Sequence, residues 1–377
     1  MGSYENDSGG FSLGEGYIDP GDQSAAHIKQ FQDAFYQKSY PANGAYWAQG
    51  FVDTRFEAGD QSLWTLTGWG DGGGGLGSNA RRWFFNRIRR QTNMITGYQR
   101  LHRKSTLAVP NFEGDQLADD YNGVLTWSEQ RDGFQEYQSQ AFAGAVTTGL
   151  SFLHLYPDFT NDPISGDLFT DYVAWCNILV DPYFRKQDLS DCSALWRRRW
   201  VNAQQAKALL PGRAKEIDKM RPSGMKDGKF PLQAELLCMS TNQLFAYDEF
   251  HYRTDREGTF IIDPYTQEAT EWIVGRDDDE GELQQVLRAQ PWLKVKKMQV
   301  PTVKLAISLG GKMLYHGPNL LKIDSYPFVP YMCYYLPDLQ SYAWRVQGVV
   351  RGLRDVQWLY NLRKVIELQI LQSQHRS

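Results

Sequence analysis

The sequence YPFVPYMCYYLPDLQSYAWRVQGVVRGLRDVQWLYNLRKVIELQIL, residues 326–371, contains a long helical pattern and the segment that leads into it. Pro327 and Pro330 lack an amide hydrogen and favour extended backbone, so no helix runs through the first part. From Arg345 to Leu371 apolar residues recur at helical spacing, which predicts one long helix. A long helix with a narrow apolar stripe needs partners on its flanks, either from its own chain or from other copies. The stretch therefore indicates assembly.

The predicted helix has two different faces. The apolar stripe consists of Val346, Val349, Val350, Leu353 and Tyr360, with Val356, Leu359 and Ile366 at its border. The other face carries Arg345, Arg351, Arg354, Arg363 and Lys364. One face can thus pack against neighbours while the other stays charged.

The whole chain has 377 residues, of which 42% are hydrophobic and 14% aromatic, enough for a substantial core and more than one domain. Its net charge of -4 argues against a protein whose whole surface binds nucleic acid, but leaves room for a local basic stripe. The four cysteines lack the spacing of a zinc site or a disulfide framework. No apolar run approaches the roughly 20 residues that span a bilayer, and the N-terminus does not resemble a signal peptide. We therefore expect a folded protein with reduced thiols in a soluble compartment and no membrane contact.

The remaining pattern predicts mixed helix and sheet. Residues 1–25 are expected to be a flexible arm, because they are rich in glycine, serine and acids. The glycine run 72–75 is expected to be a hinge, since no Gly-Lys-Ser/Thr follows it as in a phosphate loop. Helices are expected at 26–40, 79–102, 115–148, 193–210 and 281–290, the first ended by Pro41 and the fourth capped by Asp191. Strands are expected at 149–156, 172–180, 234–239, 243–252, 258–263 and 270–275, with a hairpin over 293–315 that turns at Gly310 and Gly311.

The sequence offers no anchor for a common catalytic mechanism. It lacks a Gly-x-Ser-x-Gly elbow, a His-Glu-x-x-His motif, a Walker lysine and a dinucleotide-binding fingerprint. Its six histidines are scattered singly and are expected to be surface or core residues. The acidic run Asp277–Glu280 could bind a metal, but it is better explained as the negatively charged first turn of a helix. We therefore expect no catalytic residue, no metal and no cofactor.

Four stretches of the chain are similar to a known family. They are FEAGDQ at 56–61, NRIRRQTNMITG at 86–97, VDPYFRKQDLSDCSALW at 180–196, and the proline-rich segment with its helix at 326–361. On these stretches the chain resembles the portal proteins, or head-to-tail connectors, of tailed bacteriophages, especially the short-tailed ones. The motif residues are Asp181, Pro182, Asp188, Asp191, Pro327, Pro330, Asp355, Gln357 and Asn361. The chain departs from the family at Val356, where proline is frequent, and related portals continue beyond this helix into a channel loop and often a crown.

The resemblance implies a mixed α/β (α+β) portal fold that assembles as a ring. Residues 26–276 would form a wing of helices and strands, and residues 277–290 the first stem helix. Residues 291–342 would form a β-containing clip, and residues 343–377 the second stem helix, ending before any channel loop or crown. The clip strands would pair across subunits, because ring closure gives partners to edges that would otherwise be exposed.

The resemblance also implies a structural protein without enzymatic activity. Its ring, expected to be a dodecamer, would occupy one capsid vertex of the virion and form the channel for packaging and ejection of double-stranded DNA. Its partners would be copies of itself, the major capsid protein, the terminase large subunit and a tail or adaptor protein, with sequence-independent contact to DNA. Candidates for the DNA channel are Arg345, Arg351, Arg354, Arg363 and Lys364, about half of which are expected to form intersubunit salt bridges instead. Candidates for the ring interface are Val346, Val349, Val350, Leu353 and Tyr360.

Two functions of other classes stay open from the sequence alone. A metal-dependent nucleic-acid-processing enzyme would use the acids at 277–282, and a monomeric nucleic-acid-binding module would use the basic helix at 79–102. Turnover with a divalent metal would favour the enzyme, and salt-sensitive binding by a monomer would favour the module. Self-assembly into a ring favours the portal.

Overall fold

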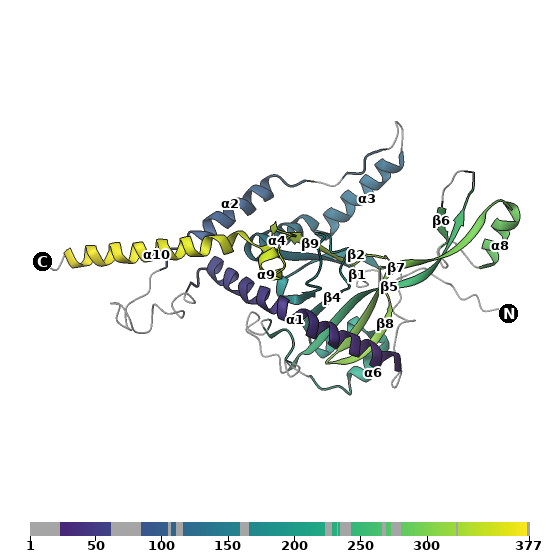
Figure 1. Cartoon of the computed structure of the whole chain (residues 1–377), viewed down its shortest axis with the longest axis horizontal. Coiled ribbons are helices and arrows are strands. Elements are labelled where there is room, and N and C mark those ends of the chain that lie inside the picture. The colour runs from purple at the N-terminus through teal and green to yellow at the C-terminus, as the bar shows by residue number, and fades with distance from the viewer. Residues whose placement is uncertain are drawn as a thin grey trace.

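The computed structural model describes residues 23–61, 84–104, 107–110, 116–158, 166–222, 228–231, 233, 243–265, 269–272, 280–321 and 323–374. The molecule is elongated, with helix α10 (Val349–Gln374) projecting at one end (Figure 1). At the other end lies a ribbon formed by strands β5 (Phe245–Ile262) and β7 (Lys294–Leu309). The sequence-based expectations for the arm at 1–22, the glycine run 72–75, the strand at 234–239 and the acids at 277–279 lie outside the described residues.

Helix α1 (Gln23–Ala58) continues through Pro41, so the predicted end of the helix at that residue is wrong. Pro41 lies on the exposed face of the helix, whereas Asn43 is buried. The Asn43 amide group donates to the carbonyls of Ser39 at 2.9 Å and Val180 at 2.8 Å, and its oxygen accepts the Val180 amide at 3.2 Å. Asn43, a residue type that favours turns, thus connects α1 to the sheet. The helix continues because the residues after Asn43 again include buried ones.

Three more helices follow: α2 (Ile88–Leu101) and α4 (Phe134–Thr148) contact α1, and α3 (Gln116–Asp132) contacts α4. The helix predicted over 79–102 begins at Ile88 within the described residues. The helix predicted over 115–148 is two helices, because Gly133 adopts a φ of 64° between them. Glycine populates this left-handed conformation without the steric penalty of a side chain.

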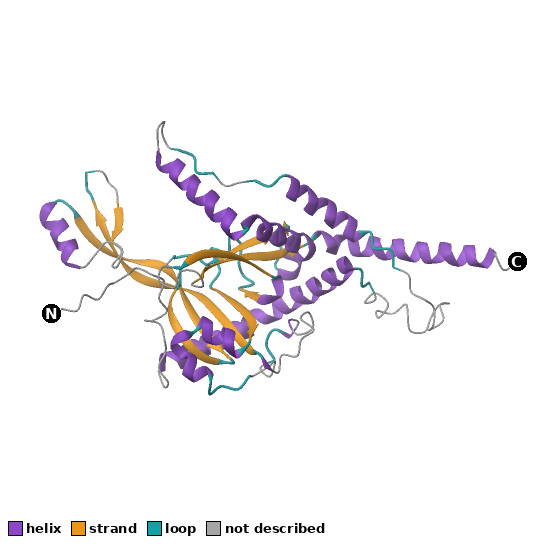
Figure 2. Ribbon diagram, turned by 180° about the vertical axis from the view of Figure 1, so that it is seen from behind, coloured by secondary structure: helices purple, strands orange, loops and turns teal. Residues whose placement is uncertain are grey.

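Two main antiparallel sheets form the body (Figure 2). In the smaller sheet, β1 (Leu150–Asp158) lies between β2 (Asp167–Val173) and β9 (Phe328–Met332). The larger sheet has the order β3-β4-β5-β7-β8, with β3 (Ile178–Val180), β4 (Ala194–Val201) and β8 (Lys312–Pro318), and β6 (Ala269–Trp272) paired to β5. A short pair, β10 (Tyr334–Tyr335) and β11 (Val346–Gln347), flanks helix α9 (Tyr342–Arg345). This architecture of helices and sheets agrees with the expected α+β class.

The segment predicted as a helix over 193–210 forms strand β4 followed by the short helix α5 (Ala203–Leu209). Each of the three consecutive arginines 197–199 has an acidic partner on β5. A strand can therefore bury Arg197 and Arg198 beside acidic partners. Asn202 caps α5 in a capping box with Gln205, whose amide it accepts at 2.8 Å.

Other expected elements are confirmed with changed limits. The strands predicted at 243–252 and 258–263 are one strand, β5, and the hairpin turns at Gly310 and Gly311 as predicted. The strand predicted at 172–180 is divided by the 3-10 helix η3 (Trp175–Asn177). The turn η4 (Pro211–Arg213) and helix α6 (Ala214–Ile217) follow α5.

Strands β5 and β7 pair along their length, from Tyr247 opposite Leu309 to Ile262 opposite Lys294. Helix α8 (Glu280–Ala289) lies at the far end of this ribbon, opposite to α10 (Figure 1). Residues 291–342, the segment predicted to form the clip, contribute strands to both body sheets. The sequence order of helix, hairpin and helix does not reveal that β7 finds its partner in β5 of the same chain.

The core lies between α1 and the larger sheet. Phe31 of α1 contacts Phe250 of β5 with ring centroids 5.6 Å apart, and Tyr36 contacts Trp196 of β4 at 5.6 Å. Trp196 and Phe250 are fully buried. Burial of one large apolar side chain stabilises the fold by about 1.5–3 kcal/mol, so these aromatic contacts fix α1 on the sheet.

A layer of polar side chains lies between the two sheets. Arg197 of β4 contacts Nδ1 of His154 on β1 at 2.8 Å, and Phe328 of β9 stacks on His154 and meets His251 of β5 edge-on. Burial, together with Arg197, lowers the pKa of His154 well below its ordinary value. Burial also lowers the pKa of His251 to about 4, against the attraction of Glu249. Both imidazoles are therefore neutral in the folded protein at neutral pH.

Lowering the pH from 7 to 5 should destabilise the body. The unfolded chain protonates these histidines near pH 6.5, whereas the folded chain keeps His251 neutral down to about pH 4. The stability contribution is thus present above pH 6.5 and is lost as the pH falls toward 4, on the order of 2 kcal/mol at pH 5 for His251 alone. Urea unfolding at several pH values measures this change. The double variant His154→Gln, His251→Gln should show a flatter pH dependence, and an unfolding midpoint of the unchanged protein that stays constant would contradict the assignment.

Candidate functional site

Helix α10 docks on the body through a largely polar face. Its buried residues are Val350, Arg354, Gln357 and Asn361, which recur at helical spacing. By contrast, Val356 and Leu359 are 65% and 49% exposed. The family-motif residues Gln357 and Asn361 therefore face the body, while part of the apolar surface of the helix faces outward. Asp355, the third motif residue of this helix, is exposed.

Gln357 and Asn361 bind the backbone of the segment that leads into α2. The Gln357 oxygen accepts the Arg87 amide at 2.9 Å, and its nitrogen donates to the Phe85 carbonyl at 2.7 Å. The Asn361 oxygen accepts the Phe85 amide at 3.0 Å, and its nitrogen donates to Gln61. A side-chain amide has both a donor and an acceptor, so it can satisfy the two kinds of backbone group at once. This explains why carboxamides suit these two positions.

Asp53 of α1 is the ionic partner of α10. Its carboxylate is fully buried and accepts from Arg354 at 2.7 Å and from Arg351 at 3.3 Å. Arg354 also donates to the side-chain oxygen of Gln49 at 2.8 Å. Burial raises the pKa of Asp53 to about 6, while the two guanidinium groups oppose that shift, so the carboxylate is ionised at neutral pH. Removal of one partner from such a pair leaves a buried charge uncompensated, at about 3–5 kcal/mol.

Parts of three motif stretches meet at this place. Phe56 of FEAGDQ, Ile88 of NRIRRQTNMITG and Val350 of α10 form a buried cluster, against which Leu353 packs. Asn86 adds a hydrogen bond to the Glu57 carbonyl at 2.9 Å. We call this site the helix junction, which comprises the C-terminal half of α1, residues 84–92 and the first half of α10. The motifs therefore describe how one chain fixes the direction of its long helix.

The third motif forms the loop 181–193, which its own carboxylates organise. Asp181 accepts the amides of Tyr183 at 3.1 Å and Ser193 at 3.2 Å, and Asp191 accepts the Arg185 amide at 2.6 Å. Aspartates hold turns in this way by replacing a backbone acceptor. Asp191 thus stabilises a loop, and its predicted role as a helix cap is wrong.

Arg345 fastens this loop to the start of α10. Its guanidinium group is largely buried and donates to four backbone carbonyls: Pro182 at 3.0 Å, Phe184 at 2.7 Å, Leu339 at 2.9 Å and Gln340 at 3.1 Å. The fork of five N–H groups makes arginine suited to such a multiple contact. Arg345 is therefore a structural clamp, to which the family-motif residue Pro182 contributes a carbonyl.

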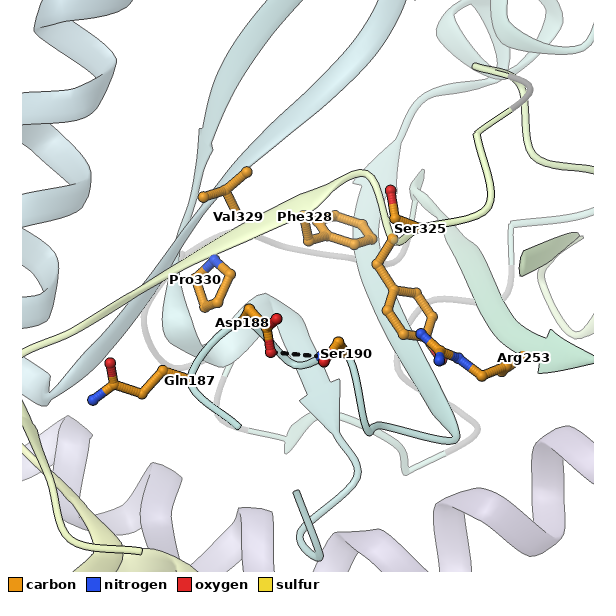
Figure 3. A pocket seen from close by; sticks show the side chains of 9 residues that line it. Gln187, Asp188, Ser190, Arg253, Ser325, Phe328, Val329 and Pro330 are labelled. Atoms are coloured by element: carbon orange, nitrogen blue, oxygen red, sulfur yellow. Dashed lines mark hydrogen bonds between the residues drawn. The ribbon is translucent and has the colours of Figure 1, made fainter. Parts of the chain in front are cut away.

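A groove of about 440 Å³ lies between this loop and strand β9 (Figure 3). Its lining includes Asp188, Arg253, Phe328 and Pro330. The Asp188 carboxylate accepts the Ser190 amide at 3.1 Å, the bond drawn in Figure 3, and so closes a turn of the loop. Pro330 stands on an edge strand, where a missing amide hydrogen discourages pairing with a foreign strand. Pro327, the other proline of the motif, accepts the Leu155 amide through its carbonyl at 2.9 Å.

The structure places three of the five predicted channel residues inside the chain. Arg345 binds backbone carbonyls, and Arg351 and Arg354 pair with Asp53, so these charges are used within one subunit. Arg363 is exposed, and Lys364 forms an ion pair with Glu367 at 2.6 Å. Of the five predicted channel residues, Arg363 and Lys364 therefore remain the candidates for contact with DNA.

The predicted interface residues are also occupied within the chain. Val346 and Val350 are fully buried, and Leu353 packs against the cluster of the helix junction. Tyr360 accepts a hydrogen bond from Arg87 at 3.0 Å through its hydroxyl group, and Val349 is half-buried. The sequence of an apolar stripe does not show whether the stripe packs against its own chain or against another copy. In this structure most of the predicted interface residues pack against their own chain.

Sequence reasoning missed the side of α1 that binds α10. Asp53 and Gln49 lie one turn apart on a helix whose neighbouring positions are aromatic, and both supply oxygen atoms to Arg354. The sequence signal for this site was Asp53, a single acidic residue among aromatic residues on α1. Within the described residues, no group of His, Cys, Asp and Glu side chains could hold a metal ion. No helix in that part of the chain is long and apolar enough to cross a membrane.

Replacement of Gln357 by alanine should weaken the helix junction. The Arg87 amide and the Phe85 carbonyl would lose their partners, which lowers the free energy of unfolding by about 1–3 kcal/mol. Thermal unfolding and hydrogen exchange of residues 84–90 measure the effect. Gln369→Ala, at an exposed position of the same helix, is the matched control. Equal stability of the two variants would contradict the proposed docking.

Arg345→Lys should destabilise the protein although the charge is kept. An ammonium group cannot reach four carbonyls at once, so buried acceptors lose their donors at about 1–3 kcal/mol each. The exposed Arg363→Lys is the control and should leave the melting temperature unchanged. If both substitutions are tolerated equally, Arg345 is not a clamp.

Comparison with known protein families identifies the family to which the chain belongs. Residues 77–377 match the family described as Phage P22-like portal protein. The matched region contains the loop 181–193, the groove, strand β9 and all of α10, and it covers most of the chain. No curated protein matches the chain. The sequence match and the motif residues at the helix junction lead to one conclusion: the chain belongs to the family of Phage P22-like portal proteins, which are structural proteins and not enzymes.

Proposed function

We propose that this chain is the subunit of a ring at one vertex of a phage capsid. Double-stranded DNA passes through the ring during packaging into the virion and during ejection. The ring is a dodecamer, and it contacts the major capsid protein, the terminase large subunit and a tail or adaptor protein. Membership of the portal family supports the structural role, and the geometry of α10 supports the assembly.

The second half of α10 carries the argument for assembly. Residues 362–374 extend away from the body (Figure 1). Apolar side chains are distributed around this half: Leu362, Val365, Ile366, Leu368, Ile370 and Leu371, of which Ile366, Ile370 and Leu371 are exposed. A helix that is apolar on several sides is normally buried among other elements. Copies of the same chain on both flanks of α10 would supply that burial.

The charge of this half of α10 suits a channel through which DNA slides. A duplex carries about one negative charge per 1.7 Å of its axis, and many strong phosphate contacts would hold it in place. Arg363 is exposed, whereas the charge of Lys364 is balanced by Glu367. Each subunit thus offers few cations, and its contact with DNA is independent of the base sequence. In this proposal α10 is the stem helix and the body with its two sheets is the wing.

Ile366→Asp should prevent ring formation and leave the body folded. The substitution places a charge on the apolar surface of the projecting half, where the neighbouring copy would bury it at the cost of several kcal/mol. Native mass spectrometry and negative-stain imaging of the purified chain measure assembly. Gln369→Asp, which introduces the same charge at an exposed polar position, is the control and should still form rings. A stable monomer of the unchanged chain at high concentration would contradict the proposal.

A further inference from the structure

Helix α3 has an apolar face that the described part of the chain leaves exposed. Among its described residues only Ala118 is buried. Tyr121, Val124 and Trp127 are each more than half exposed, at 57%, 62% and 58%. These three residues and Asp120 lie along one side of the helix, and we call them the α3 stripe. An apolar surface of this kind on a folded protein usually marks an interaction site.

The helix has polar contacts at its C-terminal end and near its middle. Arg131 donates to Asp167 and to the Leu168 carbonyl of β2, both at 2.8 Å. Nearer the N-terminal end, Asn122 pairs with the backbone of Ala108 at 2.6 and 3.1 Å. The middle of α3 contains Gly123, which weakens a helix by about 1 kcal/mol relative to alanine. Only one described residue of this 17-residue helix is buried, so packing on the described part of its own chain stabilises it little, and we expect a partner on the stripe.

The exposed side of α10 has a matching pattern. Val356, Leu359, Arg363, Ile366 and Ile370 follow one another at intervals of three and four residues, and we call them the α10 stripe. The same intervals relate Asp120, Val124 and Trp127 on α3. This spacing lets side chains of one helix insert between those of another at a shallow crossing angle.

Each stripe is interrupted by one charge, and the two charges are opposite. Asp120 and Arg363 are both exposed and have no ion-pair partner within the described part of the chain. A single polar or charged position inside an apolar seam fixes the register and the choice of partner. We propose that the α3 stripe of one copy binds the α10 stripe of a second copy, with Asp120 opposite Arg363.

This contact joins two different surfaces of the chain. In both overall views, α3 and α10 leave the body in different directions (Figures 1 and 2). A contact between unlike surfaces repeats from copy to copy, and it closes into a ring when the rotation permits. The inference rests on the proposed ring, names the two faces that meet in it, and assigns Arg363 to the contact between copies instead of to DNA.

Charge reversal tests the contact. Asp120→Arg and Arg363→Asp should each reduce the fraction of assembled chain about tenfold, and the double exchange should restore it, because the pair is then re-formed with opposite polarity. Asp119→Arg is the control, since that exposed acid lies on another side of α3 and should not affect assembly. Circular dichroism verifies that each variant is folded. Rings that persist in both single variants would overturn the contact, and so would a double exchange that fails to restore them. Neither result contradicts the ring proposed for the unchanged chain.

Cross-linking separates a failure of the contact from a failure of the ring. Copies with Val124→Cys are mixed with copies with Ile366→Cys, so any mixed disulfide must join two chains. The expected product is this mixed dimer, at least tenfold above the Val124→Cys pair or the Ile366→Cys pair alone. If the unchanged chain forms no ring but the mixed dimer appears, the contact stands and the proposed function fails. If the mixed dimer is absent, the inference is wrong whether or not rings form.

Discussion

The ion pair between Asp53 of α1 and Arg354 of α10 is buried, and such a pair is stable only where further hydrogen bonds satisfy both groups. Gln49 and Arg351 supply those bonds, and Gln357 and Asn361 continue the same polar surface along the helix. Apolar packing tolerates small rotations, whereas this array permits one position of α10 on the body. The rest of the elongated molecule is arranged around that direction.

Because α10 contacts the body mainly through polar side chains, several of its apolar side chains lie on the outer face. On most amphipathic helices the apolar stripe is turned toward the body of the same chain. On α10 three of the four buried residues are polar, and the apolar residues Val356, Leu359 and Ile366 are exposed. One helix can therefore satisfy two partners without competition between them. The helix contacts its own chain through hydrogen-bonding groups, and it would contact the proposed neighbour through its apolar surface.

The sequence predicted the class of the fold, the long C-terminal helix, the hairpin at Gly310 and Gly311 and the family. It failed where a local pattern has two physical solutions. Residues 193–210 fit one helix until the acids of β5, about 50 residues away, are known to pair with arginines 197–199. Pro41 fits a helix end until Asn43 is seen to bond Val180 in β3. In the site, the motif residues were found, but their roles depend on long-range partners such as Asp53, which no spacing within α10 can indicate.

The four carbonyl contacts of Arg345 and the polar array of the helix junction have a geometric consequence for a symmetric assembly. A helix of 26 residues is about 39 Å long, so a tilt of about 10° at its base displaces its far end by roughly 7 Å. In a closed ring such an error would occur in every subunit and would change the diameter of the central opening. In the proposed ring, the directional bonds at the base of α10 would fix the angle of this helix within each subunit, and thereby the width of the central opening before any two subunits meet.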